Sequence, residues 1–352
     1  MGRIGAWVRG VRLWAGLLVL LLPAFAGSGA AREVRDDAGR VVAVPERAAR
    51  VFAAGPPAAI LLYTLAPETM LGWPRANSAA EAAFMPERYA SLPELGRLTG
   101  RGDTANLEVV LATRPDLLFD YGTINPTYAS LADRVQQQVR LPYLLIDGRF
   151  ERIPDAYRTL GRLLGMAERA ETLAAYAEAT LAEARRIAAS VPAGQRPRVY
   201  YARGPEGLET GLAGSINTEL LDWVGAENVA KAAGSGGLAA VSIEQVLQWD
   251  PDVILTLDPG FFARVKEDPR WKDLRAVREG RVYLGPGLPF GWFDRPPSVN
   301  RLIGVRWLLS VLHPNRASAD LREEARTFYA LFYHREPSRE QLDRLLAGAL
   351  RR

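Results

Sequence analysis

The chain has 352 residues and no cysteine, and 44 Lys and Arg residues stand against 40 Asp and Glu residues. Three of the basic residues and none of the acidic ones lie in residues 1–31, which leaves 41 basic against 40 acidic residues in the rest of the chain. This near-balance predicts no nucleic-acid partner, because a phosphate backbone is bound by a clear excess of Lys and Arg. The missing cysteines exclude disulfides and a cysteine nucleophile.

Residues 1–31 are predicted to be a secretory signal peptide. Three arginines precede an apolar run of 13 residues, Leu13–Phe25, and small residues follow up to Ala31. This order is typical of a signal peptide, and a helix that spans a bilayer needs about 20 apolar residues. We expect cleavage after Ala30 or Ala31. Because a lipid anchor would need a cysteine, we expect an unanchored monomer that an outer membrane retains in the periplasm.

The next segment, residues 32–152, alternates short apolar runs with helical patterns. Strands are predicted at 51–54, 117–119 and 143–146, and helices at 57–65, 107–112 and 126–139. Such alternation favours a mostly parallel sheet with helices on both faces. We therefore expect an N-terminal α/β lobe here.

Residues 153–192 contain no strand-like pattern and are predicted to link two lobes. An apolar stripe at helical spacing predicts one helix over 167–190, which would be about 36 Å long at about 1.5 Å per residue. A helix of this length would form a stiff connection.

The strand pattern returns in residues 193–352, which predicts a C-terminal α/β lobe. Its strands are expected at 199–202, 253–257 and 282–284, and a helix is expected to begin near Pro296. The fold class is therefore predicted as α/β, with two Rossmann-like lobes, a single long backbone helix between them and a ligand cleft between the lobes.

The two lobes share a sequence repeat. Asn106–Phe119 and Ser242–Leu255 each begin with a helix-capping residue, carry a glutamate two positions later and continue through a short helix and Pro-Asp into a strand. The glutamates are Glu108 and Glu244.

With these residues, and with Gly225–Val229 and Val277–Tyr283, the chain resembles the periplasmic binding proteins for ferric siderophores, haem and vitamin B12. The resemblance implies a ligand held between the lobes and delivered to an ABC permease dimer with its ATPase subunits, without a cofactor. It also implies that Glu108 and Glu244 dock to permease arginines. The alternative for both glutamates is that they only favour the helix dipole.

Ligand contacts are predicted first in residues 285–301. Pro296 and Pro297 suit the first turn of a helix, so Trp292 and Arg295 would lie where a helix N-terminus favours an anion. The alternative is that Trp292 packs in the core and Arg295 pairs with a carboxylate.

Further ligand contacts are predicted at strand ends, because ligands of open α/β sheets bind beyond the carboxyl ends of the strands. The candidates are Tyr121, Thr123, Tyr201 and Arg203, with Tyr121 and Arg203 facing each other across the gap. We expect Arg295 to contribute more to binding than Arg203. For each of these residues a packed tyrosine or a solvated arginine is the alternative.

The sequence predicts a carrier rather than an enzyme, because no catalytic motif of the common classes is present. Direct binding of a transition metal is not expected, since the only histidines are His313 and His334; His313 is expected to cap a helix end and His334 to pack in an aromatic stretch. The predicted ligand is a metal chelate, with a ferric siderophore ahead of haem or cobalamin, and a molybdate-like oxyanion is the alternative. A receptor-docking sensor and an enzyme working at the cleft are the other classes left open.

Overall fold

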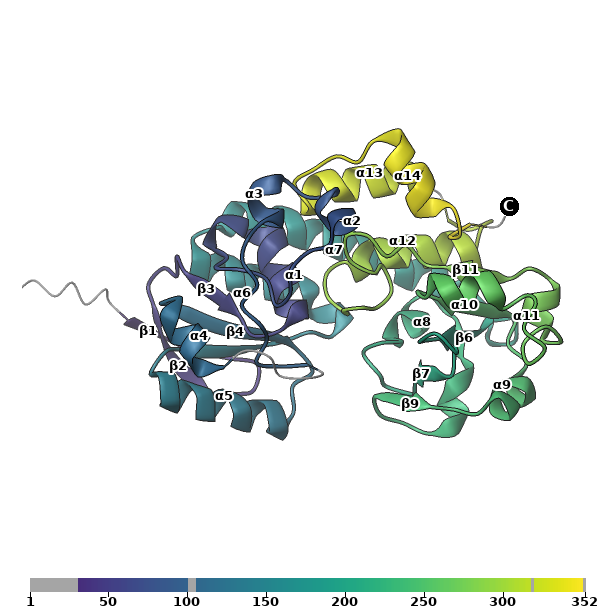
Figure 1. Ribbon diagram of the computed structural model, residues 1–352, viewed down its shortest axis with the longest axis horizontal. Coiled ribbons are helices and arrows are strands. Elements are labelled where there is room, and N and C mark those ends of the chain that lie inside the picture. The colour runs from purple at the N-terminus through teal and green to yellow at the C-terminus, as the bar shows by residue number, and fades with distance from the viewer. Residues whose placement is uncertain (1–30, 101–105, 318–319, 351–352) are drawn as a thin grey trace, which may run out of the picture.

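The computed structural model describes residues 31–100, 106–317 and 320–350, and it consists of two α/β lobes joined by a long helix (Figure 1). The predicted signal peptide lies outside the described residues except for Ala31. The predicted fold class is confirmed.

The N-terminal lobe contains a three-stranded parallel sheet in the order β3-β4-β5 and, before it in the chain, an antiparallel hairpin. The predicted strands and helices of this lobe are confirmed, whereas the hairpin β1–β2 and the short helices α2 and α3 were not predicted. The elements are β1 (Ala31–Arg35), β2 (Val41–Pro45), β3 (Val51–Ala53), α1 (Pro56–Leu65), α2 (Ala79–Ala82), α3 (Glu87–Ala90), α4 (Leu107–Ala112), β4 (Leu117–Gly122), α5 (Pro126–Val139) and β5 (Tyr143–Asp147).

The C-terminal lobe contains a four-stranded parallel sheet in the order β11-β10-β6-β8 and a separate hairpin of β7 and β9. Its three predicted strands are confirmed as β6, β10 and β11. The elements are β6 (Arg198–Ala202), β7 (Glu209–Gly211), α8 (Glu219–Trp223), β8 (Glu227–Asn228), β9 (Leu238–Ala240), α9 (Ile243–Trp249), β10 (Val253–Thr256), α10 (Pro259–Arg264), α11 (Arg275–Arg278) and β11 (Val282–Leu284).

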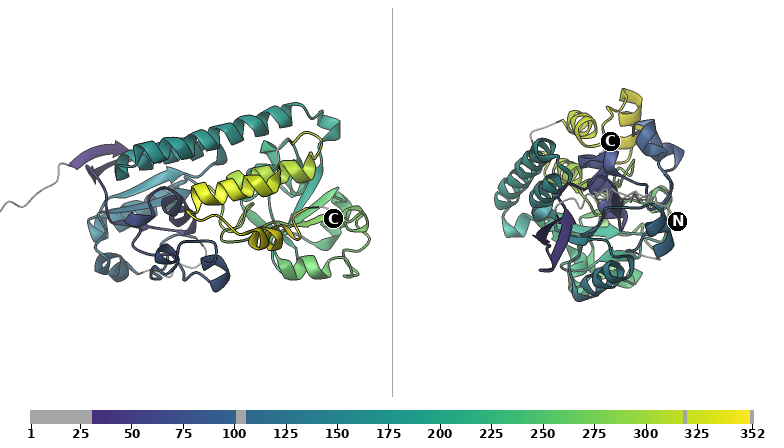
Figure 2. Two further views of the ribbon diagram at one scale, coloured as in Figure 1. Left: turned by 90° about the horizontal axis from the view of Figure 1, so that it is seen from above. Right: turned by 90° about the vertical axis from the view of Figure 1, so that its left-hand side faces the viewer.

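Two helices connect the lobes, α6 (Ile153–Leu164) and α7 (Ala167–Ala189). The long helix predicted over 167–190 is α7, which runs beside both lobes (Figure 2). The helices approach closely at Gly161, where an added Cβ would lie 2.3 Å from the Cβ of Ala170. The apolar stripe of α7 is buried along its length, so tertiary packing stabilises this helix as well as its own hydrogen bonds.

The chain ends in three helices, α12 (Arg301–Leu312), α13 (Leu321–Phe332) and α14 (Arg339–Leu346). The prediction that a helix begins near Pro296 is wrong, because α12 begins five residues later at Arg301. The Asn300 side-chain amide donates to the carbonyls of Gly291 and Pro296, the latter at 3.1 Å. These bonds hold residues 291–299 as an irregular segment in front of the helix.

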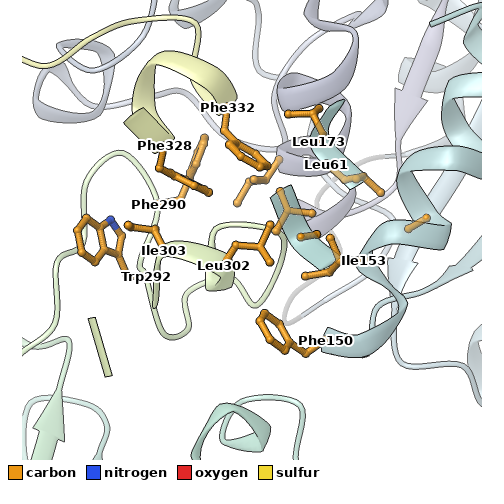
Figure 3. Packing of buried hydrophobic residues seen from close by; sticks show 14 of the residues in the cluster. Leu61, Phe150, Ile153, Leu173, Phe290, Trp292, Leu302, Ile303, Phe328 and Phe332 are labelled. Atoms are coloured by element: carbon orange, nitrogen blue, oxygen red, sulfur yellow. The ribbon is translucent and has the colours of Figure 1, made fainter. Parts of the chain in front are cut away.

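One hydrophobic core extends through both lobes and the connecting helices (Figure 3). Phe328 and Phe332 of α13 stack with ring centroids 4.2 Å apart, and Phe332 also contacts Tyr176 of α7 and Tyr157 of α6 at 5.1 and 6.2 Å. Leu61 of α1 belongs to the same buried cluster. The C-terminal helix α13 therefore packs on both connecting helices and not only on the C-terminal lobe.

The sequence repeat is also a repeat of structure. Asn106 and Ser242 both cap their helices, through side-chain oxygens that accept from the backbone N–H of Val109 at 2.8 Å and of Gln245 at 3.3 Å. Both helices have a buried valine four residues after the cap. The strands that follow pair in the same register, β4 with β3 and β10 with β6.

A feature that the sequence comparison missed extends the repeat to the first strand of each lobe. The guanidinium of Arg50, just before β3, donates to the Thr113 carbonyl at the end of α4 at 2.6 Å. Arg198, at the start of β6, donates to the Trp249 carbonyl at the end of α9 at 2.6 Å. Both arginines thus bind the carbonyl end of the repeated helix, where a cation is favoured.

Candidate ligand site and docking helices

The strand ends of the N-terminal lobe meet residues 294–301 and α8 of the C-terminal lobe. The Ser298 hydroxyl donates to the Pro57 carbonyl at 2.8 Å, and Arg301 donates to the Gly148 carbonyl at 2.7 Å. The Phe150 N–H in turn donates to the Glu219 carboxylate at 3.0 Å. We call these six residues the lobe junction. It is the part of the described chain where strand ends of one lobe contact the other lobe directly.

Arg301 is the central charged group of the lobe junction. It is fully buried, it forms an ion pair with Glu219, and its guanidinium lies 5.6 Å from the Phe150 ring centroid. Burial raises the pKa of Glu219, and the nearby Arg301 opposes that shift. A buried charge of this kind is stable only when paired and hydrogen-bonded, and Arg301 meets both conditions.

Tyr121 lies inside the protein next to the lobe junction. Only 1% of its surface is exposed, and burial raises its pKa while the cation of Arg301 lowers it. The prediction that Tyr121 faces Arg203 is not supported, because the arginine beside Tyr121 is Arg301. Thr123, two residues further on, is exposed.

Tyr201 and Arg203 bind a buried carboxylate that the sequence analysis did not single out, Asp294. The Tyr201 hydroxyl donates to Asp294 at 3.1 Å and the Arg203 Nε donates to the same oxygen at 2.8 Å. Asn217 Nδ2 and the backbone N–H of Arg295 donate to the other oxygen at 2.8 and 2.7 Å.

Arg203 has a second carboxylate partner, Glu209, at 2.6 Å. Burial raises the pKa of Tyr201 well above its usual range, and the Asp294 charge raises it further. Tyr201 is therefore packed, as its alternative proposed, whereas Arg203 is ion-paired and not solvated, which its alternative did not propose.

Trp292 is packed in the core, as the alternative for this residue proposed. It has no exposed surface, and its Nε1 donates to the Tyr329 hydroxyl at 3.1 Å. Gly304 of α12 allows this segment to lie against the helix, because an added Cβ would collide with the Trp292 carbonyl.

Arg295 differs from the other candidates because its side chain is exposed and forms no hydrogen bond or ion pair with any described residue. Its backbone is in the left-handed region, with φ of 64°, and its N–H binds Asp294. The prediction that it lies at a helix N-terminus is wrong, since α12 begins at Arg301. The Arg295 guanidinium is thus exposed next to the buried Asp294 and has no partner in the described part of the chain.

Glu108 and Glu244 occupy equivalent exposed positions on α4 and α9, one on each lobe (Figure 1). Neither carboxylate pairs with a basic side chain in the described parts of the chain. Hydrogen bonds from its own backbone N–H and from Ser242 lower the pKa of Glu244. Both groups are available to a partner.

The two histidines have structural partners. The His313 ring donates from Nε2 to the Val224 carbonyl, at 2.7 Å, and Val224 is the C-cap of α8. His313 is the C-cap residue of α12, but its ring binds the end of the neighbouring helix α8. The His334 Nε2 donates to the Tyr63 carbonyl at 2.9 Å, and burial lowers the pKa of His334 to about 4.

Two negative findings concern only the described residues. No group of three or more His, Cys, Asp or Glu side chains among them is arranged to hold a metal ion. None of the helices in the described ranges combines the length and the apolar character that a membrane crossing requires.

Two α/β lobes that meet through strand ends and share a long helix define a two-lobed ligand-binding protein. The profile of the periplasmic binding protein family matches residues 79–287, and the chain belongs to this family. Proteins of this family serve ABC importers together with permease and ATPase components. The matched relatives are binding proteins rather than enzymes.

Among curated proteins, the molybdate-binding protein MolA of Haemophilus influenzae is 28% identical over 267 residues, which are 68% of this chain and 74% of MolA. An ABC transporter solute-binding protein from Sulfurospirillum deleyianum has a solved structure that is 31% identical, with a TM-score of 0.82 over 90% of this chain and 99% of that one. The structure of MolA bound to molybdate has a TM-score of 0.72 and 22% identity, and covers 87% and 99% of the two chains. At that identity the last likeness concerns the fold alone.

Proposed function

We propose that this protein is the periplasmic substrate-binding component of an ABC importer and that it captures a small oxyanion of the molybdate kind beside Arg295. The observation that carries this proposal is the exposed guanidinium of Arg295 without a carboxylate partner among the described residues. A guanidinium offers five N–H donors in a planar fork, which matches the oxygens of an oxyanion.

The local charge supports a binding role for Arg295 rather than for Arg203. Arg203 is already neutralised by Asp294 and Glu209, so an anion at Arg203 would meet two carboxylates. Arg295 contributes only its backbone N–H to Asp294 and keeps its side-chain charge for another group. The N–H bond holds the backbone at residue 295, so the position of its Cα, from which the side chain extends, is fixed.

The burial of the aromatic residues favours a small ligand over a large chelate. Tyr201, Trp292 and Phe293 have relative exposures of 0, 0 and 1%, so none of them offers a flat surface to a porphyrin or catecholate. The relationship to MolA, whose name states that it binds molybdate, supports the same ligand class.

The metal chelate predicted from the family resemblance is the second candidate. A free arginine suits the carboxylates or phenolates of a siderophore as well as it suits an oxyanion. A ferric siderophore stays ahead of haem and cobalamin in this alternative, because those two ligands depend more on aromatic surface.

Calorimetric titration of the purified protein with molybdate, a ferric siderophore, haem and cobalamin tests the proposal. We expect molybdate to bind, and Arg295→Ala to weaken that binding about ten- to hundredfold, which corresponds to one charge-assisted hydrogen-bonded contact. The matched control is Arg186→Ala, which removes an exposed arginine from a different element, the helix α7. This variant should bind molybdate like the wild type. Binding of a siderophore but not of molybdate would support the second candidate, and equal affinity of wild type and Arg295→Ala would rule out the site.

We further propose that Glu108 and Glu244 dock the protein to its permease dimer. Each lobe carries one carboxylate without a basic partner in the described residues, at equivalent positions of a structural repeat, which matches a partner with two-fold symmetry. Charged groups at the rim of an interface mainly steer association and fix its orientation. A role in helix capping alone would not require the same acid in both lobes.

A further inference from the structure

The two docking helices each expose a large apolar side chain. Four large hydrophobic residues are exposed in the described part of the chain, and two of them are Leu111 of α4 at 50% and Leu247 of α9 at 42%. These two residues occupy equivalent positions, each five residues after the helix-capping residue. The other two are Val41 at 53% and Leu350 at 39%, which lie outside the repeat.

Each leucine lies next to a docking glutamate. Leu111 follows Glu108 by three positions and Leu247 follows Glu244 by three, and residues with this spacing are neighbours on a helix surface. Both helices keep a buried valine just before the leucine, Val110 or Val246, at 0% exposure. Because the valine anchors the helix to its lobe, the leucine that follows it points outward in both lobes.

Folding of the lobes does not account for these leucines. Leu107 and Ile243, at the start of the two helices, pack against the core clusters of their lobes, whereas Leu111 and Leu247 belong to none of those clusters. A single exposed leucine is common on protein surfaces. The repeated segment keeps the same exposed leucine in both lobes, beside the same carboxylate, which has no basic partner among the described residues, and this coincidence is more specific.

We infer that Leu111 and Leu247 are apolar contacts with the permease dimer, each inserted beside the glutamate of the same helix. The inference rests on the docking role proposed for Glu108 and Glu244. The partner is a two-fold symmetric membrane protein that presents, on each half, a basic side chain next to an apolar depression. The charges orient the encounter, and burial of the leucines slows dissociation.

Charge and apolar burial respond differently to salt, which provides the test. Salt screens exposed charge pairs but leaves apolar burial in place. Affinity of the full-length mature protein for its permease–ATPase complex in lipid nanodiscs is measured at low and high ionic strength. The variants are Leu111→Gln/Leu247→Gln and Glu108→Ala/Glu244→Ala, with Leu350→Gln as the matched control for an exposed leucine elsewhere.

We expect the double leucine variant to bind about tenfold more weakly at both ionic strengths, mainly through faster dissociation. The double glutamate variant should lose affinity mostly at low ionic strength, and Leu350→Gln should match the wild type. Titration with molybdate should give the same affinity for all of these proteins, which excludes misfolding as the cause.

The two failures are distinguishable. If the glutamate variant is impaired and the leucine variant binds like the wild type, the leucine inference is wrong and the proposed docking stands. If neither double variant is impaired, the docking role itself is wrong. The single variants Leu111→Gln and Leu247→Gln are measured as well. A loss of affinity in only one of them would also overturn the inference, because a symmetric partner must use both leucines.

Discussion

The two lobes share a repeated arrangement of helix and strands, but their buried aspartates have different hydrogen-bond and ion-pair partners. Asp116 and Asp252 occupy the same place in the repeat and accept backbone N–H groups at the start of the first strand, from Ala49 and from Arg198, each at 2.8 Å.

Outside the repeat, Asp294 of the C-terminal lobe has no exposure and four donors. The N-terminal lobe has buried acids of two kinds: Asp36 and Asp147 pair with Arg40 and Arg149, whereas Asp120 has no basic partner among the described residues.

Asp120 of β4 is 8% exposed, and unlike Asp147 of β5 it has no ion pair with a described residue. Burial raises its pKa, and hydrogen bonds from the Tyr121 N–H and from Thr99 only oppose that shift. The donors of Asp294 come from segments that have no counterpart in the other lobe. A repeated backbone frame therefore does not determine how a buried charge is satisfied.

The largest effect is expected for Asp294→Ala. This change leaves the Arg203 cation with one carboxylate and removes the acceptor of Tyr201, Asn217 and the Arg295 N–H. Breaking a buried ion pair from one side typically costs about 3–5 kcal/mol. Urea denaturation should show such a loss in the free energy of unfolding. Asp120→Ala is the control from the other lobe, and an equal or larger loss there would contradict the difference between the two acids.

An intermediate and equal effect is expected for Asp116→Ala and Asp252→Ala. Asp116 accepts from two backbone N–H groups, and Asp252 accepts from one and also pairs with the partly exposed Arg275, an ion pair of a kind that adds little to stability. The expected cost of each change is about 1–3 kcal/mol. The same denaturation experiment should give losses of similar size for the two variants. A clear difference would show that the two aspartates are equivalent in geometry but not in energy.

The smallest effect is expected for Asp120→Asn, and it depends on pH. Because the folded-state pKa of Asp120 is raised, the folded protein binds a proton more tightly than the unfolded chain does, between the ordinary aspartate pKa of about 3.9 and the raised value. The stability contributed by this group therefore falls as pH rises through that interval. The amide side chain of the variant carries no charge, so the variant should gain stability relative to the wild type between about pH 4 and about pH 7. Unfolding curves at about pH 4 and about pH 7 check this. A stability difference between variant and wild type that stays the same at both pH values would refute it.

The elements that the sequence predicted are those with a buried apolar signal. Strands β3, β4, β5, β6, β10 and β11 and the helix α7 follow apolar runs or stripes that only burial explains. The hairpin β1–β2 was missed although β2 contains two buried valines, because its partner strand β1 has no fully buried residue and carries no apolar run. The start of α12 was misplaced because a proline pair fits a first helical turn as well as it fits a loop.

The predicted site residues divided in a way that no sequence pattern could decide. Arg203 and Arg295 both lie next to turns. The Arg203 guanidinium is nevertheless paired with Glu209 and Asp294, whereas the Arg295 side chain is exposed. Asp294 and Arg301 were missed because a single charged residue has no periodicity to distinguish a buried position from an exposed one. Only the surrounding chain determines which of them loses contact with water.

The sequence by itself determined the two α/β lobes, the long connecting helix, the repeat and the positions of Glu108 and Glu244. Those features arise from periodic burial and from local capping, which act within short stretches of chain. The tertiary structure decided the lobe junction, the partners of Asp294 and the exposed position of the Arg295 side chain. These depend on residues far apart in the chain, such as Arg301 and Gly148, which are 153 positions apart, and the energy of a charge depends on which distant groups replace its water.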